Sequence, residues 1–84
     1  MDKQEIAAIF EEIATLLELK GENPFRIRAY RKGARSLLNS NRSLKKLIKE
    51  DTLTDLAGIG DDLAGKIRML ALKERLPFYD QLKK

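Results

Sequence analysis

The chain has 84 residues, a net charge of +4 at pH 7 and neither cysteine nor histidine. This composition excludes disulfides, thiolate chemistry, the usual zinc sites and histidine acid–base catalysis. The length fits one domain over residues 1–84, and no apolar run or signal peptide indicates a membrane, so we expect a cytoplasmic protein without a membrane partner.

The positive charge is concentrated in the middle of the chain. Residues 20–49 carry ten bases and one acid, whereas residues 1–19 carry one base and five acids. Such concentration is typical of proteins that bind a polyanion such as nucleic acid. The alternative is a solvated surface that is rich in lysine and arginine.

The first predicted helix opens with a capping box, in which Asp2 and Glu5 satisfy free N–H groups at its start. Apolar residues follow at helical spacing to about Leu19, and Gly21 can adopt the left-handed conformation that ends a helix. The acids of this helix lie mostly off the apolar stripe, which predicts an outer face turned away from nucleic acid. They are Glu11, Glu12 and Glu18.

Asn23 and Pro24 predict the start of a second helix, as N-cap and first helical residue. Its predicted core stripe comprises Ile27, Tyr30, Ala34, Leu37 and Leu38. Four bases without a neighbouring acid gather on the adjoining flank, where we favour phosphate contact over a solvated face: Arg28, Arg31, Lys32 and Arg35. Gly33 costs a helix interior about 1 kcal/mol relative to alanine. We therefore expect a second helix to pack closely there, in preference to a sugar-phosphate backbone.

The rest of the chain predicts shorter elements. Ser43 begins a short helix, and Thr52 caps a helical turn over residues 52–56. A longer helix begins near Asp61 and ends near residues 73–75, and Pro77 begins a final turn. The prediction is an all-α fold, a compact bundle of four to five short helices without strands.

The turn Gly58-Ile59-Gly60 lies between two of these helices. Its glycines permit positive φ and close approach of a ligand, and the free N–H groups of the next helix point toward the turn. Glycine-aliphatic-glycine between short helices is the helix-hairpin-helix pattern, which holds a DNA phosphate without reading base sequence. Asp61 and Asp62 are suitable caps for that helix, but they repel a phosphate and predict weak binding at the hairpin.

Four separated segments carry a more specific signal: Asn23 to Lys32, Leu53 to Gly60, the pairs Leu63-Ala64 and Lys66-Ile67, and Leu76 to Tyr79. Together they closely resemble the amino-terminal domain of family X DNA polymerases, of the bacterial and archaeal type, over essentially the whole chain. In that family the domain binds the 5′-phosphate side of gapped or nicked DNA during base-excision repair. In some members it is also a 5′-deoxyribose-phosphate lyase. The resemblance implies a nucleoid-associated monomer, joined to a polymerase domain in a longer natural chain.

The resemblance also implies roles for single residues. It places the Schiff-base lysine at Lys66, the pocket aromatic at Tyr30, a phosphate-contacting base at Arg26, and the DNA-binding hairpin at Gly58, Ile59 and Gly60. It further implies a monovalent cation, Na⁺ or K⁺, held by the backbone carbonyls of Thr54, Leu56 and Ile59. No other cofactor is expected.

Two departures from the family pattern bear on Lys66. Asp62 stands where lyase-active members often have a phosphate-binding lysine, and Gly65 replaces a common acidic residue. Partial burial and nearby bases favour the neutral amine that attacks an aldehyde, whereas Asp62, one turn away, favours the ammonium. A catalytic lysine and a half-buried structural lysine therefore both stay open.

Three functions follow from the sequence. The leading one is a DNA-binding module, the second is a lyase that uses Lys66, and the third is a helical protein-interaction or DNA-tethering domain that has kept only the fold. Polymerase chemistry is not expected from these residues, because the carboxylates that hold two magnesium ions are absent.

Overall fold

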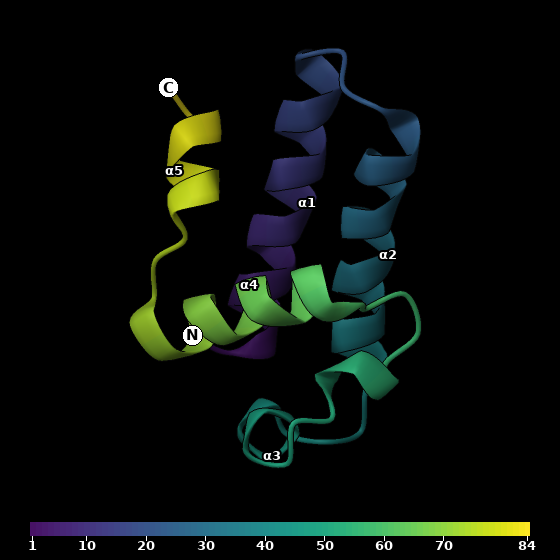
Figure 1. Cartoon of the computed structure of the whole chain (residues 1–84), viewed down its shortest axis with the longest axis vertical. Coiled ribbons are helices and arrows are strands. Elements are labelled where there is room, and N and C mark those ends of the chain that lie inside the picture. Colours follow the sequence, from purple (N-terminus) through teal and green to yellow (C-terminus); the bar gives the residue numbers. More distant parts are fainter.

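Five α-helices and one short 3₁₀ turn make up the structure, a computed structural model that describes residues 1–84. They are α1 (Lys3–Leu19), α2 (Pro24–Asn39), α3 (Leu44–Lys49), η1 (Leu53–Asp55), α4 (Asp61–Lys73) and α5 (Pro77–Leu82). Helices α1 and α2 lie side by side, α4 crosses them, α5 runs beside α1, and α3 lies at one end of the bundle (Figure 1). The predicted all-α bundle is confirmed.

Local capping signals set most helix starts. The carboxylate of Asp2 accepts from the Glu5 N–H at 2.8 Å, and the Glu5 carboxylate accepts from the Asp2 N–H at 3.1 Å. The Asn23 side chain accepts from the Phe25 N–H at 2.8 Å, immediately before α2. The Ser43 hydroxyl caps α3 in the same manner. These bonds satisfy donors that a helix start leaves free.

Two predicted caps make no capping bond. Thr52 is the N-cap residue of η1 as predicted, but its hydroxyl is buried without a hydrogen-bond partner. Gly60 is the N-cap of α4, and neither Asp61 nor Asp62 makes a capping bond, because both lie inside the first turn. Their negative charges act on α4 only through its dipole.

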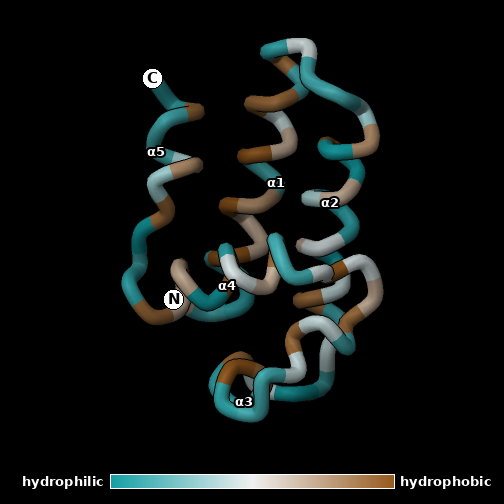
Figure 2. The backbone as a smooth tube through the Cα atoms, viewed as in Figure 1, coloured by the Kyte–Doolittle hydropathy of each residue, from teal (hydrophilic) through white to brown (hydrophobic).

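The core is one cluster of buried apolar side chains from α1, α2, α3, η1 and α4, with Ile59 of the hairpin and Leu76 before α5, and partly buried side chains of α5 pack against it. Hydrophobic segments recur along α1 at helical spacing (Figure 2). The predicted stripe of α2 is confirmed up to Leu37, but Leu38 is 48% exposed because it lies further round the helix, away from α1. A Cβ on Gly33 would lie 3.0 Å from a methyl of Leu63, so α2 does pack closely against α4 at this glycine.

Candidate nucleic-acid interface and lysine pocket

The hairpin turn joins η1 to α4 in the order predicted. Gly58 has φ +78°, and a Cβ there would meet the side chain of Lys32 at 2.9 Å, so both backbone and packing require glycine. Gly60 does not use the positive φ that glycine permits, because it is the extended N-cap of α4, with φ −91°. Buried Ile59 anchors the turn in the core.

The start of α4 is open to a ligand. The N–H groups of residues 61–63 have no acceptor within the chain, as the first turn of a helix requires. A Cβ at Gly60 would have no heavy atom within 4 Å. The hairpin therefore presents free backbone donors and no side chain that blocks them at this position.

Two contacts join the hairpin to α2. The Lys32 side chain lies against Gly58, and the Ser36 hydroxyl donates to the carbonyl of Ala57. The basic flank of α2, defined as Arg28, Arg31, Lys32 and Arg35, is therefore continuous with the turn. Free N–H groups and guanidinium groups are the donors that nucleic-acid phosphates accept.

The basic flank lines a hollow of about 300 Å³ together with Glu11 of α1. Arg31 also forms an ion pair with Glu18 at 3.5 Å. The prediction that the acids of α1 turn away from this surface is therefore wrong for Glu11 and Glu18. The pattern within α1 alone does not show where α2 packs. Because α2 lies beside α1, the side of α1 that carries Glu11 and Glu18 faces the basic flank.

The third acid of this group, Glu12, has a different partner. It accepts a hydrogen bond from the Tyr79 hydroxyl of α5. That bond, with burial and the charge of Glu12, raises the pKa of Tyr79 to about 12. This contact fastens α5 to α1.

Lys66 of α4 is mostly buried against aromatic rings of α2 and α5. Its side chain is 16% exposed, and Nζ lies 2.7 Å from a carboxylate oxygen of Asp62. Nζ also lies 5.0 Å from the ring centre of Phe78 and 5.9 Å from that of Tyr30. The predicted partial burial of Lys66 and its pairing with Asp62 are both present.

Phe78 of α5 organises this pocket, a role that sequence reasoning did not assign. Its ring stacks on Tyr30 with 6.1 Å between centres, and the Arg26 guanidinium lies 5.3 Å from its centre. Arg26 is held in turn by Glu22 at 3.2 Å. The position of Phe78 in the matching segment Leu76 to Tyr79 was the available signal. The structure thus brings three predicted site residues together around one aromatic ring: Arg26, Tyr30 and Lys66.

Tyr30 is 2% exposed, and its hydroxyl is buried without a hydrogen-bond partner. Such a group lowers the stability of the fold. The carbonyls predicted to hold a monovalent cation belong to residues in and beside the hairpin, where the Leu56 carbonyl accepts from the Ile59 N–H at 3.1 Å.

The structure holds no cluster of three or more acidic side chains that fits a metal ion, and no helix long and apolar enough to span a membrane.

Comparison with known proteins assigns the chain to a family that contains the same hairpin motif. The profile of the helix-hairpin-helix domain family matches residues 1–76. The chain is 43% identical over 60 residues to DNA polymerase/3′-5′ exonuclease PolX of Bacillus subtilis (strain 168). This match covers 71% of the chain and 10% of the relative, so the chain spans about a tenth of that protein's length. The chain therefore belongs to the helix-hairpin-helix domains of family X DNA polymerases.

Proposed function

We propose that this domain binds DNA through its sugar-phosphate backbone, at gaps or nicks that carry a 5′-phosphate, as the amino-terminal module of a family X repair polymerase. The observation that carries the proposal is the continuity between the hairpin, with its free N–H groups, and the basic flank of α2. Family membership supports the same function. Backbone N–H donors and flexible Lys and Arg side chains hold phosphates and so fix the position of a protein on a duplex, but they do not distinguish one nucleobase from another.

The two aspartates at the start of α4 are expected to repel a DNA phosphate, but the ion pairs at the site reduce this repulsion. Asp62 is paired with Lys66, so part of its charge is compensated at the start of α4. Arg28 and Arg35 have no carboxylate partner, and Arg28 lies over the ring of Phe25, whereas Arg31 must leave Glu18 to meet a phosphate. Binding is therefore expected to rest first on Arg28, Lys32 and Arg35.

The salt dependence of binding tests the role of the basic flank. Each phosphate neutralised by a base contributes a slope of about −0.9 to log K against log salt. The double variant Arg28→Gln with Arg35→Gln is expected to flatten the slope for gapped duplex by about two units. The matched control, Lys46→Gln with Lys73→Gln, removes the same charge from α3 and the end of α4 and is expected to change it by less than about one unit.

Equal slopes for the two double variants would contradict the assignment of the basic flank. Binding indistinguishable from background, without salt dependence, would instead favour the alternative of a protein-interaction domain that has kept only the fold.

We further propose that Lys66 gives the domain 5′-deoxyribose-phosphate lyase activity. Neutral Nζ adds to the sugar aldehyde carbon and water leaves, which forms a Schiff base. Loss of a C2′ proton then breaks the C3′–O bond and expels the downstream DNA with its 5′-phosphate. The rings of Tyr30 and Phe78 support this role, since the Lys66 side chain that lies against them is only 16% exposed, while Asp62 must release the ammonium first.

Borohydride trapping tests the lyase proposal separately from DNA binding. The unmodified domain is expected to form a covalent adduct with a 5′-deoxyribose-phosphate end, and Asp62→Asn is expected to raise its yield. Lys66→Ala should abolish the adduct, whereas Lys73→Ala should not. No adduct with the unmodified protein, or an adduct that persists in Lys66→Ala, would refute the proposal.

A monovalent cation, Na⁺ or K⁺, is proposed at the carbonyls of Thr54, Leu56 and Ile59. The turn supports this because carbonyl oxygens are hard ligands and the Leu56 carbonyl keeps one lone pair beside its bond to Ile59. Replacing K⁺ by tetramethylammonium at equal ionic strength is expected to weaken DNA binding, since the larger ion cannot enter such a turn. Unchanged affinity would contradict the site.

A further inference from the structure

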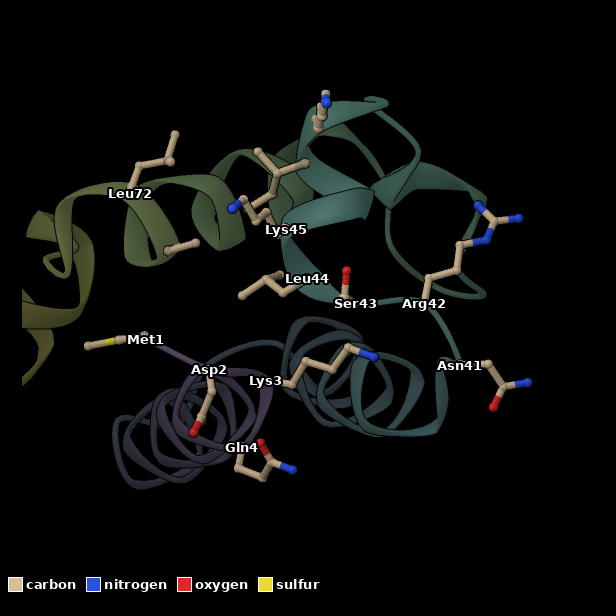
Figure 3. Close-up of a pocket in the computed structure, with 13 residues that line it drawn as sticks. Met1, Asp2, Lys3, Gln4, Asn41, Arg42, Ser43, Leu44, Lys45 and Leu72 are labelled. Carbon is tan, nitrogen blue, oxygen red and sulfur yellow. The ribbon is translucent and has the colours of Figure 1, made fainter.

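An apolar groove of about 760 Å³ lies at the α3 end of the bundle, between the start of α1, the α2–α3 connection, α3 and the end of α4 (Figure 3). Its apolar lining comes from the residue at the start of the chain, from α3 and from α4: Met1, Leu44, Ile48, Ala71 and Leu72. Leu72 is 69% exposed, whereas Leu63, Ile67 and Leu70 of the same helix are buried. The groove is thus a hydrophobic surface that no segment of this chain covers.

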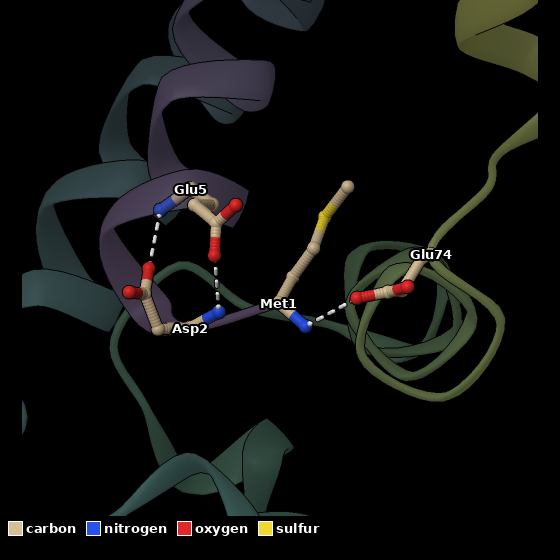
Figure 4. A network of polar contacts seen from close by, with 4 residues as sticks. All are labelled: Met1, Asp2, Glu5 and Glu74. Atoms are coloured by element: carbon tan, nitrogen blue, oxygen red, sulfur yellow. Dashed lines mark hydrogen bonds and ion pairs between the residues drawn. The ribbon is translucent and has the colours of Figure 1, made fainter.

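The wall formed by the start of α1 is held in place through Met1, two residues before the helix begins. The terminal ammonium of Met1 pairs with Glu74 at 3.4 Å, which ties the start of α1 to the end of α4 (Figure 4). The capping box at Asp2 and Glu5 fixes the next turn (Figure 4). The groove is therefore bounded by ordered walls and not by a loose terminus.

The rim of the groove is positively charged. Lys45 and Lys49 project from α3 without a carboxylate partner, and Lys3 donates to a backbone carbonyl, that of Ser40, at 2.8 Å. Arg42 faces Asp55 only at 3.8 Å. The one acid in the lining, Asp2, is already engaged as a helix cap. Charge complementarity therefore selects an acidic occupant.

DNA is a poor occupant for this groove. A phosphate placed against the apolar floor would lose water without gaining hydrogen bonds there. The groove also shares no lining residue with the hollow of the basic flank, so both surfaces can be occupied together. An occupant that fits must bring apolar side chains for the floor and carboxylates for the rim.

We propose that this groove docks an acidic amphipathic helix of a partner protein. Apolar side chains at helical spacing along one face of that helix cover Leu72, Leu44 and Ile48, and carboxylates beside them pair with Lys45 and Lys49. The surface makes the domain a bridge that holds nucleic acid on the hairpin side and a protein at the α3 end. This role goes beyond DNA binding and does not depend on the lyase activity.

A synthetic helix tests the proposal with the whole 84-residue chain. The probe is a fluorescein-labelled peptide of about four helical turns, with leucines along one face and glutamates elsewhere. The control peptide has the same composition with leucines on all faces. The first peptide is expected to bind more tightly than the second, and its binding should shift the amide NMR signals of Leu44, Ile48 and Leu72.

Matched variants assign the contact to the groove. Leu72→Gln is expected to weaken binding of the peptide by about tenfold or more, because a leucine loses its apolar contact. Leu19→Gln removes an equally exposed leucine, 79% exposed at the far end of α1, and should leave affinity unchanged. Lys45→Glu should weaken binding at low salt, whereas Lys46→Glu, outside the groove on the same helix, should not.

Several results would overturn the proposal. Equal binding of the two peptides would remove the need for an amphipathic face, and equal effects of Leu72→Gln and Leu19→Gln would place the contact elsewhere. Displacement of the peptide by duplex DNA would make the groove part of the DNA surface. A dimer that Leu72→Gln dissociates would identify a second copy of this chain as the occupant.

Discussion

The buried hydroxyl of Tyr30 is predicted to lower the stability of the domain. It lies inside the core without a partner, in a residue that is 2% exposed. A buried polar group left unsatisfied costs about 1–3 kcal/mol. Tyr30→Phe removes that cost and keeps the ring contacts with Phe10 and Phe78, whose centres lie 5.4 and 6.1 Å away. We therefore expect the substitution to raise the free energy of unfolding by at least about 1 kcal/mol.

For a domain of this size, 1 kcal/mol corresponds to a rise in Tm of about 4–8 °C. Thermal and urea unfolding followed by circular dichroism measure the change. The chain supplies a matched control in its other tyrosine, since the Tyr79 hydroxyl donates to Glu12. Tyr79→Phe breaks that bond and is expected to lower stability by about 0.5–1.5 kcal/mol.

The two substitutions are expected to change the free energy of unfolding in opposite directions. If Tyr30→Phe lowers Tm as Tyr79→Phe does, the Tyr30 hydroxyl has a partner in solution and its description as unsatisfied is wrong. If Tyr30→Phe raises Tm and lowers the yield of the Lys66 adduct, the hydroxyl serves the pocket at the expense of stability, as functional groups often do.

Three further predictions follow from packing and charge. Gly65→Ala should raise the free energy of unfolding by about 1 kcal/mol, because a Cβ there meets nothing within 4 Å. Gly33→Ala should give a free energy of unfolding about 1–3 kcal/mol lower than that of Gly65→Ala, because its Cβ meets Leu63. Urea unfolding measures both. Glu11→Gln and Glu18→Gln should each raise the affinity for gapped DNA at low salt, measured by fluorescence anisotropy, and the gain should vanish at high salt. The pKa of Tyr79 is raised from 10.0 to about 12 in the folded state, so the stabilisation from its bond to Glu12 is fully present below pH 10 and is lost as pH rises toward 12. The difference in free energy of unfolding between the unmodified protein and Tyr79→Phe should shrink over that range.

Features set by neighbouring residues could be predicted from the sequence. The capping box at Asp2 and the Asn23-Pro24 start of α2 depend on bonds within one turn, so their residues predict the helix boundaries directly. Gly33 predicted close packing because no local reason favours glycine inside a helix. The order of helix, glycine turn and helix followed from the same kind of local signal.

Contacts between helices could not be predicted in this way. The pairing of Glu18 with Arg31 and of Glu12 with Tyr79 depends on how α2 and α5 lie against α1, which no periodicity within one helix specifies. The lysine pocket has the same origin, because Phe78 meets Lys66 only after α5 has folded back. Helical projection did predict that Lys66 is partly buried, since that property belongs to α4 alone.

The most direct test of the central claim is a titration of gapped duplex with and without a 5′-phosphate, at about 50 and 200 mM salt. A 5′-phosphate held by the free N–H groups of α4 is expected to improve affinity about tenfold or more. If each base of the basic flank meets one phosphate, affinity should also fall about a hundredfold between the two salt concentrations. Equal affinity for the two duplexes would contradict recognition of the 5′-phosphate, and affinity that does not fall with salt would contradict binding through the DNA backbone.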